Sequence, residues 1–96
     1  MQKEEIIRKV AKRSDNSVDT TKKIVNCLLE QIKDEVAVGH KITFMNFGTF
    51  EKVWHHDRKG INPRTKTSLL IPGHFTVNFR AGKSFKDVVS SNKKKE

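Results

Sequence analysis

The chain is poor in cysteine and in long hydrophobic runs. Its 96 residues include one cysteine, Cys27, which excludes an intramolecular disulfide and a cysteine metal cluster. Cys27 lies in a helical apolar pattern, so we expect it to be a small buried residue. No apolar run reaches the roughly 18 residues that a membrane-spanning helix needs. Residues 1–10 are too charged for a signal peptide, and we therefore expect a cytoplasmic protein.

Groups of residues that would indicate catalysis or metal binding are also lacking. No Cys–His, Ser–His–Asp or paired-carboxylate set can be placed in a cleft, so we predict no enzymatic activity and no catalytic residues. His55 and His56 are neighbours on an expected strand, and neighbouring strand residues point to opposite faces. They cannot easily chelate one ion, so we expect neither a metal nor another cofactor.

Hydrophobic residues make up 34% of the chain and charged residues 32%. This length indicates one domain, and so short a chain buries a modest core of its own. Burial against a partner is therefore plausible from composition alone.

Positive charge is concentrated in the second part of the chain. Residues 1–39 carry eight Lys/Arg and seven Asp/Glu, whereas residues 40–96 carry twelve and four. A basic surface confined to one part of a chain favours a polyanionic partner, first nucleic acid and second an anionic membrane. The alternative is that the charge only maintains solubility.

The first part has helical periodicity. Apolar residues at helical spacing predict one helix over residues 3–13 and a second over residues 18–38. Ser17 is the expected N-cap of the second helix, and Gly39 is its expected stop. The apolar stripe of the second helix is wide enough to face both its own sheet and a second copy of the chain.

From residue 41 the periodicity changes to two. Strands are expected over residues 41–45, 49–59, 67–71 and 75–79, with a turn at 46–48 and an interruption at Pro72-Gly73. The distal half of the strand over 49–59 has nothing apolar to bury, so we expect it to project as a hairpin that stays mobile until it binds. The alternative is an ordinary disordered loop. A short helix is expected over residues 80–89, with Gly82 and Lys83 at an anion-favouring start.

Three stretches carry a resemblance to a known family: FMNFGTFE at 44–51, RKGINPRT at 58–65 and FRAGKSFKDVV at 79–89. Together they closely resemble the bacterial HU/IHF family of histone-like, DNA-bending proteins. The resemblance implies an α+β fold with a helical hairpin, a three-stranded antiparallel sheet with a long β-arm, and a short C-terminal helix, in an intertwined dimer. The resemblance covers about residues 3–89. We expect a single HU/IHF-like DNA-binding domain at 1–90, with the arm at about 53–71, followed by a basic disordered tail at 91–96.

The resemblance also implies roles for particular residues. Pro63 matches the arm-tip proline that wedges between base pairs, as described for this very family. Phe47, Phe50 and Phe79 match the dimer core. The expected DNA-binding residues are Arg58, Lys59, Ile61, Asn62, Pro63, Arg64, Thr65, Lys66, Arg80, Lys83 and Lys86.

The chain departs from the family pattern in four places. Ile61 stands where relatives usually have Arg, beside the expected wedge. Asn46 and Lys66 each replace a common glycine. Trp54-His55-His56 occupies a position where the arm usually carries charged residues. We expect Trp54 to pack at the base of the arm, and the alternative is that it flanks a sugar.

The sequence therefore predicts an architectural, nucleoid-associated protein that binds the backbone and minor groove of double-stranded DNA with little sequence preference. It would bend DNA as a dimer and compact the chromosome, without contact with a membrane. A homodimer is expected, and an IHF-like heterodimer that prefers certain sites through DNA deformability is the alternative. An RNA-binding protein and a purely structural oligomer are further alternatives, although A-form RNA has a different groove geometry.

Overall fold

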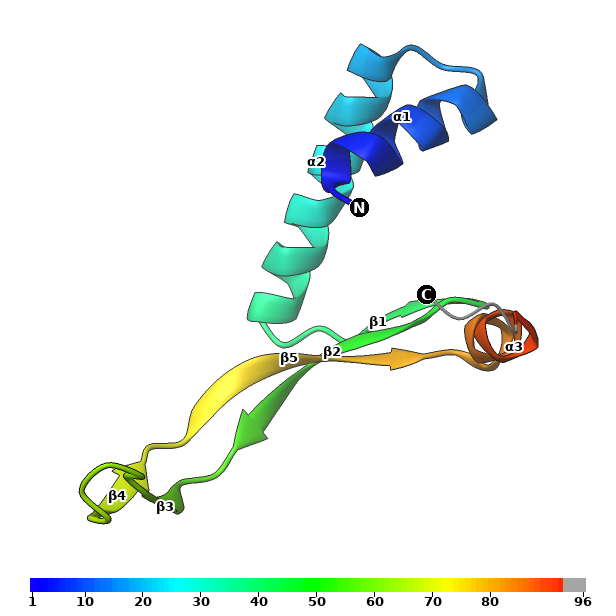
Figure 1. Cartoon of the computed structure of the whole chain (residues 1–96). Helices are drawn as coiled ribbons and strands as arrows, with labels where there is room; N and C mark the ends of the chain where they lie inside the picture. Colours follow the sequence, from blue (N-terminus) through cyan, green and yellow to red (C-terminus); the bar gives the residue numbers. More distant parts are fainter. Residues whose placement is uncertain (93–96) are drawn as a thin grey trace. The chain divides into compact units, whose positions relative to one another are not determined.

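The computed structural model describes residues 1–92, and residues 93–96 lie outside the described part. The described part contains, in chain order, two helices, five strands and a third helix (Figure 1). The chain divides into two compact units, the first over residues 1–35 and the second from Val36 onward.

The two N-terminal helices lie close to their predicted limits. Helix α1 spans Lys3–Ser14 and α2 spans Val18–Ala37. The Ser17 Oγ accepts a hydrogen bond from the Thr20 backbone N–H at 3.1 Å, which confirms Ser17 as the cap. Gly39 has φ +98°, the left-handed conformation that ends helices, and its N–H donates to the Val36 carbonyl at 2.9 Å.

The core of the first unit is small. Ile7, Ala11 and Thr21 are buried, with exposed fractions of 4% or less. Farther along α2, however, Ile24 and Leu28 are exposed by 61% and 48%. Cys27 is exposed as well, so the prediction that it is buried was wrong for the single chain. The reason is that the apolar stripe of α2 is wider than the surface this unit can cover.

The second unit is built on an antiparallel sheet of three strands in the order β1-β2-β5. Strand β1 spans Ile42–Phe44, β2 spans Gly48–His55 and β5 spans His74–Ala81. The turn between β1 and β2 closes with the Phe47 N–H donating to the Phe44 carbonyl at 3.0 Å. A side chain at Gly48 would lie 2.5 Å from the Phe79 ring, so only glycine fits at the start of β2.

The distal part of the hairpin forms a separate two-stranded sheet. Strand β3 spans Arg58–Ile61 and β4 spans Ser68–Ile71, and the two pair antiparallel. The prediction of one unbroken strand over residues 49–59 was therefore wrong, because pairing stops at His55 and resumes at Arg58. The expected interruption at Pro72-Gly73 is confirmed, and it lies opposite this break (Figure 1).

The break has a physical cause on the opposite strand. Pro72 has no backbone N–H and cannot donate to the strand facing it. The next N–H, that of Gly73, donates to the side chain of Asp57 instead of to a backbone carbonyl. The same register nevertheless continues on both sides of the break, from Ile61 opposite Ser68 to Gly48 opposite Ala81.

Helix α3 spans Lys83–Ser91 and begins three residues later than predicted. Arg80 and Ala81 extend β5 instead, because they pair with Thr49 and Gly48. The Gly82 N–H donates to the Phe47 carbonyl at 2.8 Å, which ties the start of the helix to the β1–β2 turn. A disordered tail was expected over residues 91–96, but Ser91 is the last residue of α3. Residues 93–96 lie outside the described residues.

Candidate nucleic-acid interface

The two faces of the sheet differ in character. Residues that pair across antiparallel strands share a face, and successive residues alternate between faces. One face is mainly apolar and carries Ile42, Phe44, Phe50, Lys52, Trp54, Phe75, Val77 and Phe79. The other is mainly polar and carries Thr43, Thr49, Glu51, Val53, His55, His74, Thr76, Asn78 and Arg80. The polar face is the one suited to a hydrated, charged partner.

Two interactions organise the polar face. The Thr43 and Thr49 hydroxyls lie 3.2 Å apart across β1 and β2. The Arg80 Nε lies 3.5 Å from the Glu51 Oε1, and the Arg80 side chain is 59% exposed. Exposed ion pairs contribute at most about 1 kcal/mol, so Arg80 remains available to an anion from solution.

The start of α3 adjoins this face. A shallow hollow there is lined by Thr49, Phe79, Arg80, Ala81, Gly82 and Lys86. Gly82 is the N-cap and supplies no side-chain hydrogen bond to the first turn, where Lys83 adds a positive charge. Open N–H groups at a helix start, together with the helix dipole, favour an anion such as a phosphate. Arg80, Lys83 and Lys86 thus lie around one anion-favouring region, and their contact with DNA remains a prediction.

The arm tip is a hydrogen-bonded loop between β3 and β4. The Asn62 N–H donates to the Thr67 carbonyl at 2.9 Å, and the Lys66 N–H donates to the Asn62 carbonyl at 2.7 Å. The Asn62 Oδ1 also accepts the Arg64 N–H at 2.9 Å, and the Thr67 hydroxyl bonds to that of Thr65 at 2.7 Å. Pro63 is exposed at this tip. The loop therefore presents a rigid apolar ring that lacks a donor of its own.

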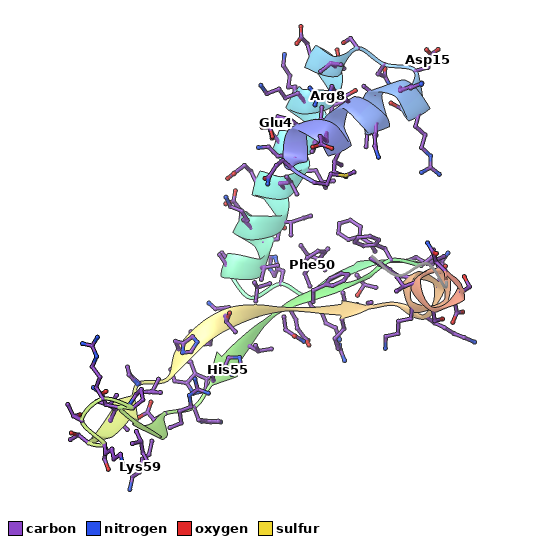
Figure 2. All side chains as sticks on the ribbon, in the orientation of Figure 1. Glu4, Arg8, Asp15, Phe50, His55 and Lys59 are labelled. Carbon is purple, nitrogen blue, oxygen red and sulfur yellow. The ribbon has the colours of Figure 1, made fainter. Side chains whose placement is uncertain are left out.

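The cations of the arm surround this tip. Arg58 and Lys59 are exposed and occupy successive positions of β3, so they project to opposite faces of the arm. Arg64 and Lys66 are exposed in the loop itself. Figure 2 shows Lys59 at the distal end of the hairpin. Positive charge is thus available on both faces of the arm and at its tip.

Comparison with known proteins agrees with this geometry. The family model described as "Bacterial DNA-binding protein" matches residues 1–90. The chain belongs to this family. It is 36% identical to the DNA-binding protein HU of Thermotoga maritima over 93% of this chain and 99% of that one. It is 33% identical to HU-beta 2 of Neisseria meningitidis over 94% of this chain and 99% of that one.

Solved structures of the HU branch of the family match the fold. The Anabaena HU–DNA cocrystal structure has a TM-score of 0.89 at 32% identity, covering 94% of this chain and 98% of that one. A mutant of Thermotoga maritima HU has a TM-score of 0.68 at 29% identity, covering 93% and 99%. The predicted α+β fold with its β-arm is confirmed. The family consists of DNA-binding proteins rather than enzymes.

The phenylalanines expected at the dimer core of such a protein form one cluster. Phe50 and Phe79 have ring centroids 4.7 Å apart, Phe47 and Phe79 are 5.6 Å apart, and Phe47 and Phe85 are 5.2 Å apart. Phe47 and Phe79 nonetheless remain 46% and 39% exposed in the single chain. Their assignment to a shared dimer core remains a prediction.

Trp54 packs at the base of the arm, as predicted. Its ring meets that of Phe75 edge to face with centroids 4.8 Å apart, and the Lys52 Nζ lies 4.3 Å from the Phe75 ring centroid. Trp54 is still 46% exposed. The apolar face of the three-stranded sheet therefore continues along β2 and β5 as far as the break in strand pairing after His55.

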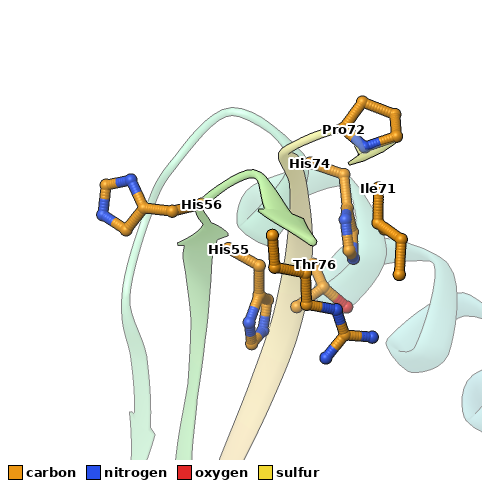
Figure 3. A pocket seen from close by; sticks show the side chains of 7 residues that line it. His55, His56, Ile71, Pro72, His74 and Thr76 are labelled. Carbon is orange, nitrogen blue, oxygen red and sulfur yellow. The ribbon is translucent and has the colours of Figure 1, made fainter. Parts of the chain in front are cut away.

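Sequence reasoning missed a histidine pair beside the division of the arm. His55 and His74 face each other across β2 and β5 with centroids 5.4 Å apart and nearly parallel rings. They line a hollow with Arg58, Ile71, Pro72, Thr76 and His56, and Figure 3 shows His55 and His56 pointing in different directions. Counting back from the tip in one hairpin register would have found this pair. Within residues 1–92 no three His, Cys, Asp or Glu side chains are grouped for a metal.

In the part of the chain that the structure describes, no helix has the length and apolar character required to cross a bilayer.

Proposed function

We propose that this protein is an architectural DNA-binding protein of the HU type, which binds duplex DNA as a dimer with little sequence preference and bends it. The observation that carries the proposal is the TM-score of 0.89 to HU in the DNA cocrystal structure, over 94% of the chain. By family membership it is associated with the nucleoid in the cytoplasm, where bending of DNA compacts the chromosome.

The polar face of the sheet and the start of α3 bind the DNA backbone. Arg80, Lys83 and Lys86 neutralise phosphates, and the open N–H groups in the first turn of α3 donate hydrogen bonds to one phosphate oxygen. Such contacts carry almost no sequence information, because every phosphate is chemically alike. A surface that binds mainly through phosphates therefore has little sequence preference.

The arm follows the minor groove. Arg58 and Lys59 project to opposite faces of β3, and their long side chains reach phosphates at the rims of the groove, while Arg64 and Lys66 contact phosphates near the tip. The Asn62 oxygen holds the loop, so the amide nitrogen is the end of that side chain that can donate to groove acceptors. Those acceptors distinguish A·T from G·C and little more.

Pro63 is the wedge. In this family, insertion of an arm-tip proline unstacks a base step at a cost of a few kcal/mol, which contacts with the bent duplex offset. Pro63 suits the role because the hydrogen bonds of Asn62, Arg64 and Lys66 hold its loop in shape. A rigid tip loses little conformational entropy when it inserts.

No comparison favours the IHF-like alternative over HU, since the relatives and solved structures described above are HU proteins. A decisive check is selection of bound duplexes from a random-sequence pool. We expect weak enrichment at most. Strong enrichment of one motif would contradict binding without sequence preference.

Bending is tested by fluorescence energy transfer between the ends of a labelled duplex. The wild type should raise the transfer efficiency, and Pro63→Ala should reduce bending more than it reduces affinity. Pro63→Leu, which keeps an apolar side chain at the tip, should recover part of the bend. Equal bending by the wild type and Pro63→Ala would show that Pro63 is not the wedge, and absence of duplex binding by the wild type would refute the proposed function.

A further inference from the structure

The two faces of the β3–β4 arm are both partly apolar. The strand register places Arg58, Gly60, Leu69 and Ile71 on one face. It places Lys59, Ile61, Ser68 and Leu70 on the other, which we name the Ile61–Leu70 face.

The two faces differ in how exposed their apolar side chains are. On the first, the Ile71 side chain closes over Gly60, where an added Cβ would lie 3.2 Å from the Ile71 Cδ1. Leu69 on that face is 45% exposed. On the Ile61–Leu70 face, Ile61 is 71% exposed and Leu70 is 68% exposed. Two large aliphatic side chains therefore stand in water on one side of a narrow arm.

The charge of the arm identifies the partner that can cover this face. Arg58, Lys59, Arg64 and Lys66 make the arm basic, and Asp57 is its one acidic residue, already bonded to the Gly73 N–H. A second arm would bring like charges together, which is unfavourable. A partner must instead be anionic and have a groove that admits the two-stranded arm and offers apolar surface inside it. The minor groove of duplex DNA has phosphates at its rims and the C–H faces of deoxyribose along its walls.

We propose that Ile61 and Leu70 lie against the deoxyribose walls of the minor groove and form a second apolar contact beside Pro63. The inference rests on the proposed function and adds to it a part of the binding free energy that does not come from charge. Burial of apolar surface releases no counterions from DNA, whereas each phosphate contact does. The Ile61–Leu70 face should therefore strengthen binding equally at low and at high salt.

The test compares Ile61→Thr and Leu70→Thr with Leu69→Thr, measured as DNA affinity over a range of salt concentrations. Threonine is β-branched and suits strands, so the arm should retain its pairing. Leu69→Thr is the matched control, since it is the same change one residue away on the opposite face. We expect each variant of the Ile61–Leu70 face to bind about fivefold more weakly at every salt concentration. The slope of log affinity against log salt should not change, and Leu69→Thr should lose less than about twofold.

Several outcomes would overturn the inference. Unchanged affinity of Ile61→Thr and Leu70→Thr would show that this face does not meet DNA. An equal loss in Leu69→Thr would indicate loosening of the arm rather than contact, and a changed salt slope would indicate displaced charges. A lower self-association of the DNA-free variants would assign the face to a second copy of the chain. Failure of the proposed function is distinguishable, because then the wild type itself would not bind or bend duplex DNA.

Discussion

Within residues 1–92, three residues other than glycine adopt left-handed backbone conformations: Asp15, Asn46 and Lys66, with φ values of 57°, 65° and 56°. Two of them, Asn46 and Lys66, stand at positions where glycine is common in the family. Asparagine tolerates this conformation well, so the β1–β2 turn is kept. Lysine at Lys66 costs roughly 1 kcal/mol, which the hydrogen bond from its N–H to the Asn62 carbonyl helps to offset. The exchange adds a cation at the tip of the arm.

Because Gly73 has no side chain, the residues at the base of the arm pack closely against its backbone. A Cβ there would collide with the Trp54 ring and lie 2.9 Å from the His55 carbonyl oxygen. We therefore predict that Gly73→Ala displaces Trp54 from Phe75 and destabilises the base of the arm by about 1–3 kcal/mol. Trp54 is the single tryptophan, so a red-shifted and more easily quenched emission reports the change directly.

The control for this prediction is Gly60→Ala, also in the arm. An added Cβ at Gly60 meets only the end of the Ile71 side chain, at 3.2 Å, and that side chain can move. Its tryptophan emission should match the wild type. An unaltered spectrum in Gly73→Ala would mean that the ring and the backbone are not packed as the structure has them.

Among the elements, the long hairpin is divided into two parts, and the distal part carries the expected DNA contacts of the arm. Strands β2 and β5 form the proximal part, and β3 and β4 form the distal part, in one continuous register. Between them the Asp57 side chain replaces a backbone acceptor for Gly73. A two-stranded ribbon with no covered face is marginal alone, so the distal part depends on its tip hydrogen bonds and on its partner.

The cations of β3 give a prediction at this scale. Replacing Arg58 and Lys59 together by alanine should lower the magnitude of the salt slope of DNA binding by about two units for each arm in contact, one per lost phosphate contact. Titrations by fluorescence anisotropy at several salt concentrations measure the slope.

Lys22→Ala with Lys23→Ala is the matched double control, since these exposed lysines lie on α2 and are not among the predicted DNA contacts. It should leave the slope as in the wild type. If the arm variant also kept the wild-type slope, Arg58 and Lys59 would not contact the DNA backbone.

For the whole molecule, the distribution of apolar surface indicates that one chain is incomplete. Within residues 1–92, the buried hydrophobic residues are Ile7, Ala11 and Val36. Large apolar side chains remain exposed in both units, among them Ile24 and Leu28 in the first and Val77 and Phe79 in the second. Dimer formation, as expected of an HU-type protein, would supply the missing cover.

We predict that folding and dimerisation are coupled, so the thermal midpoint should rise with protein concentration. For a coupled dimer, each tenfold increase in concentration adds about 1.4 kcal/mol to the apparent stability. Sedimentation of the chain expressed alone should give twice the 11.1 kDa of one chain, which also distinguishes a homodimer from a heterodimer. A midpoint independent of concentration, with the mass of one chain, would contradict a dimer.

Much of the fold could be predicted because its causes are local. The Ser17 cap, the Gly39 stop and the change of periodicity near residue 41 depend on neighbours in the chain, and the helices and the first strand follow them. The tip of the arm was equally local, since Asn62 and Pro63 specify a turn by their own chemistry. The motifs on these elements were enough for the family resemblance, which the comparisons confirmed.

The errors concern residues whose state depends on a distant strand. The break at His56-Asp57 comes from Pro72 on the opposite strand, and Arg80 and Ala81 are strand residues because Gly48 and Thr49 pair with them. The His55–His74 pair is likewise a matter of register. The sequence by itself thus determined the elements, the basic arm and the family, through local propensity and motif spacing. Only the tertiary structure decided which residues share a face and where the arm divides, because pairing joins groups that are far apart along the chain.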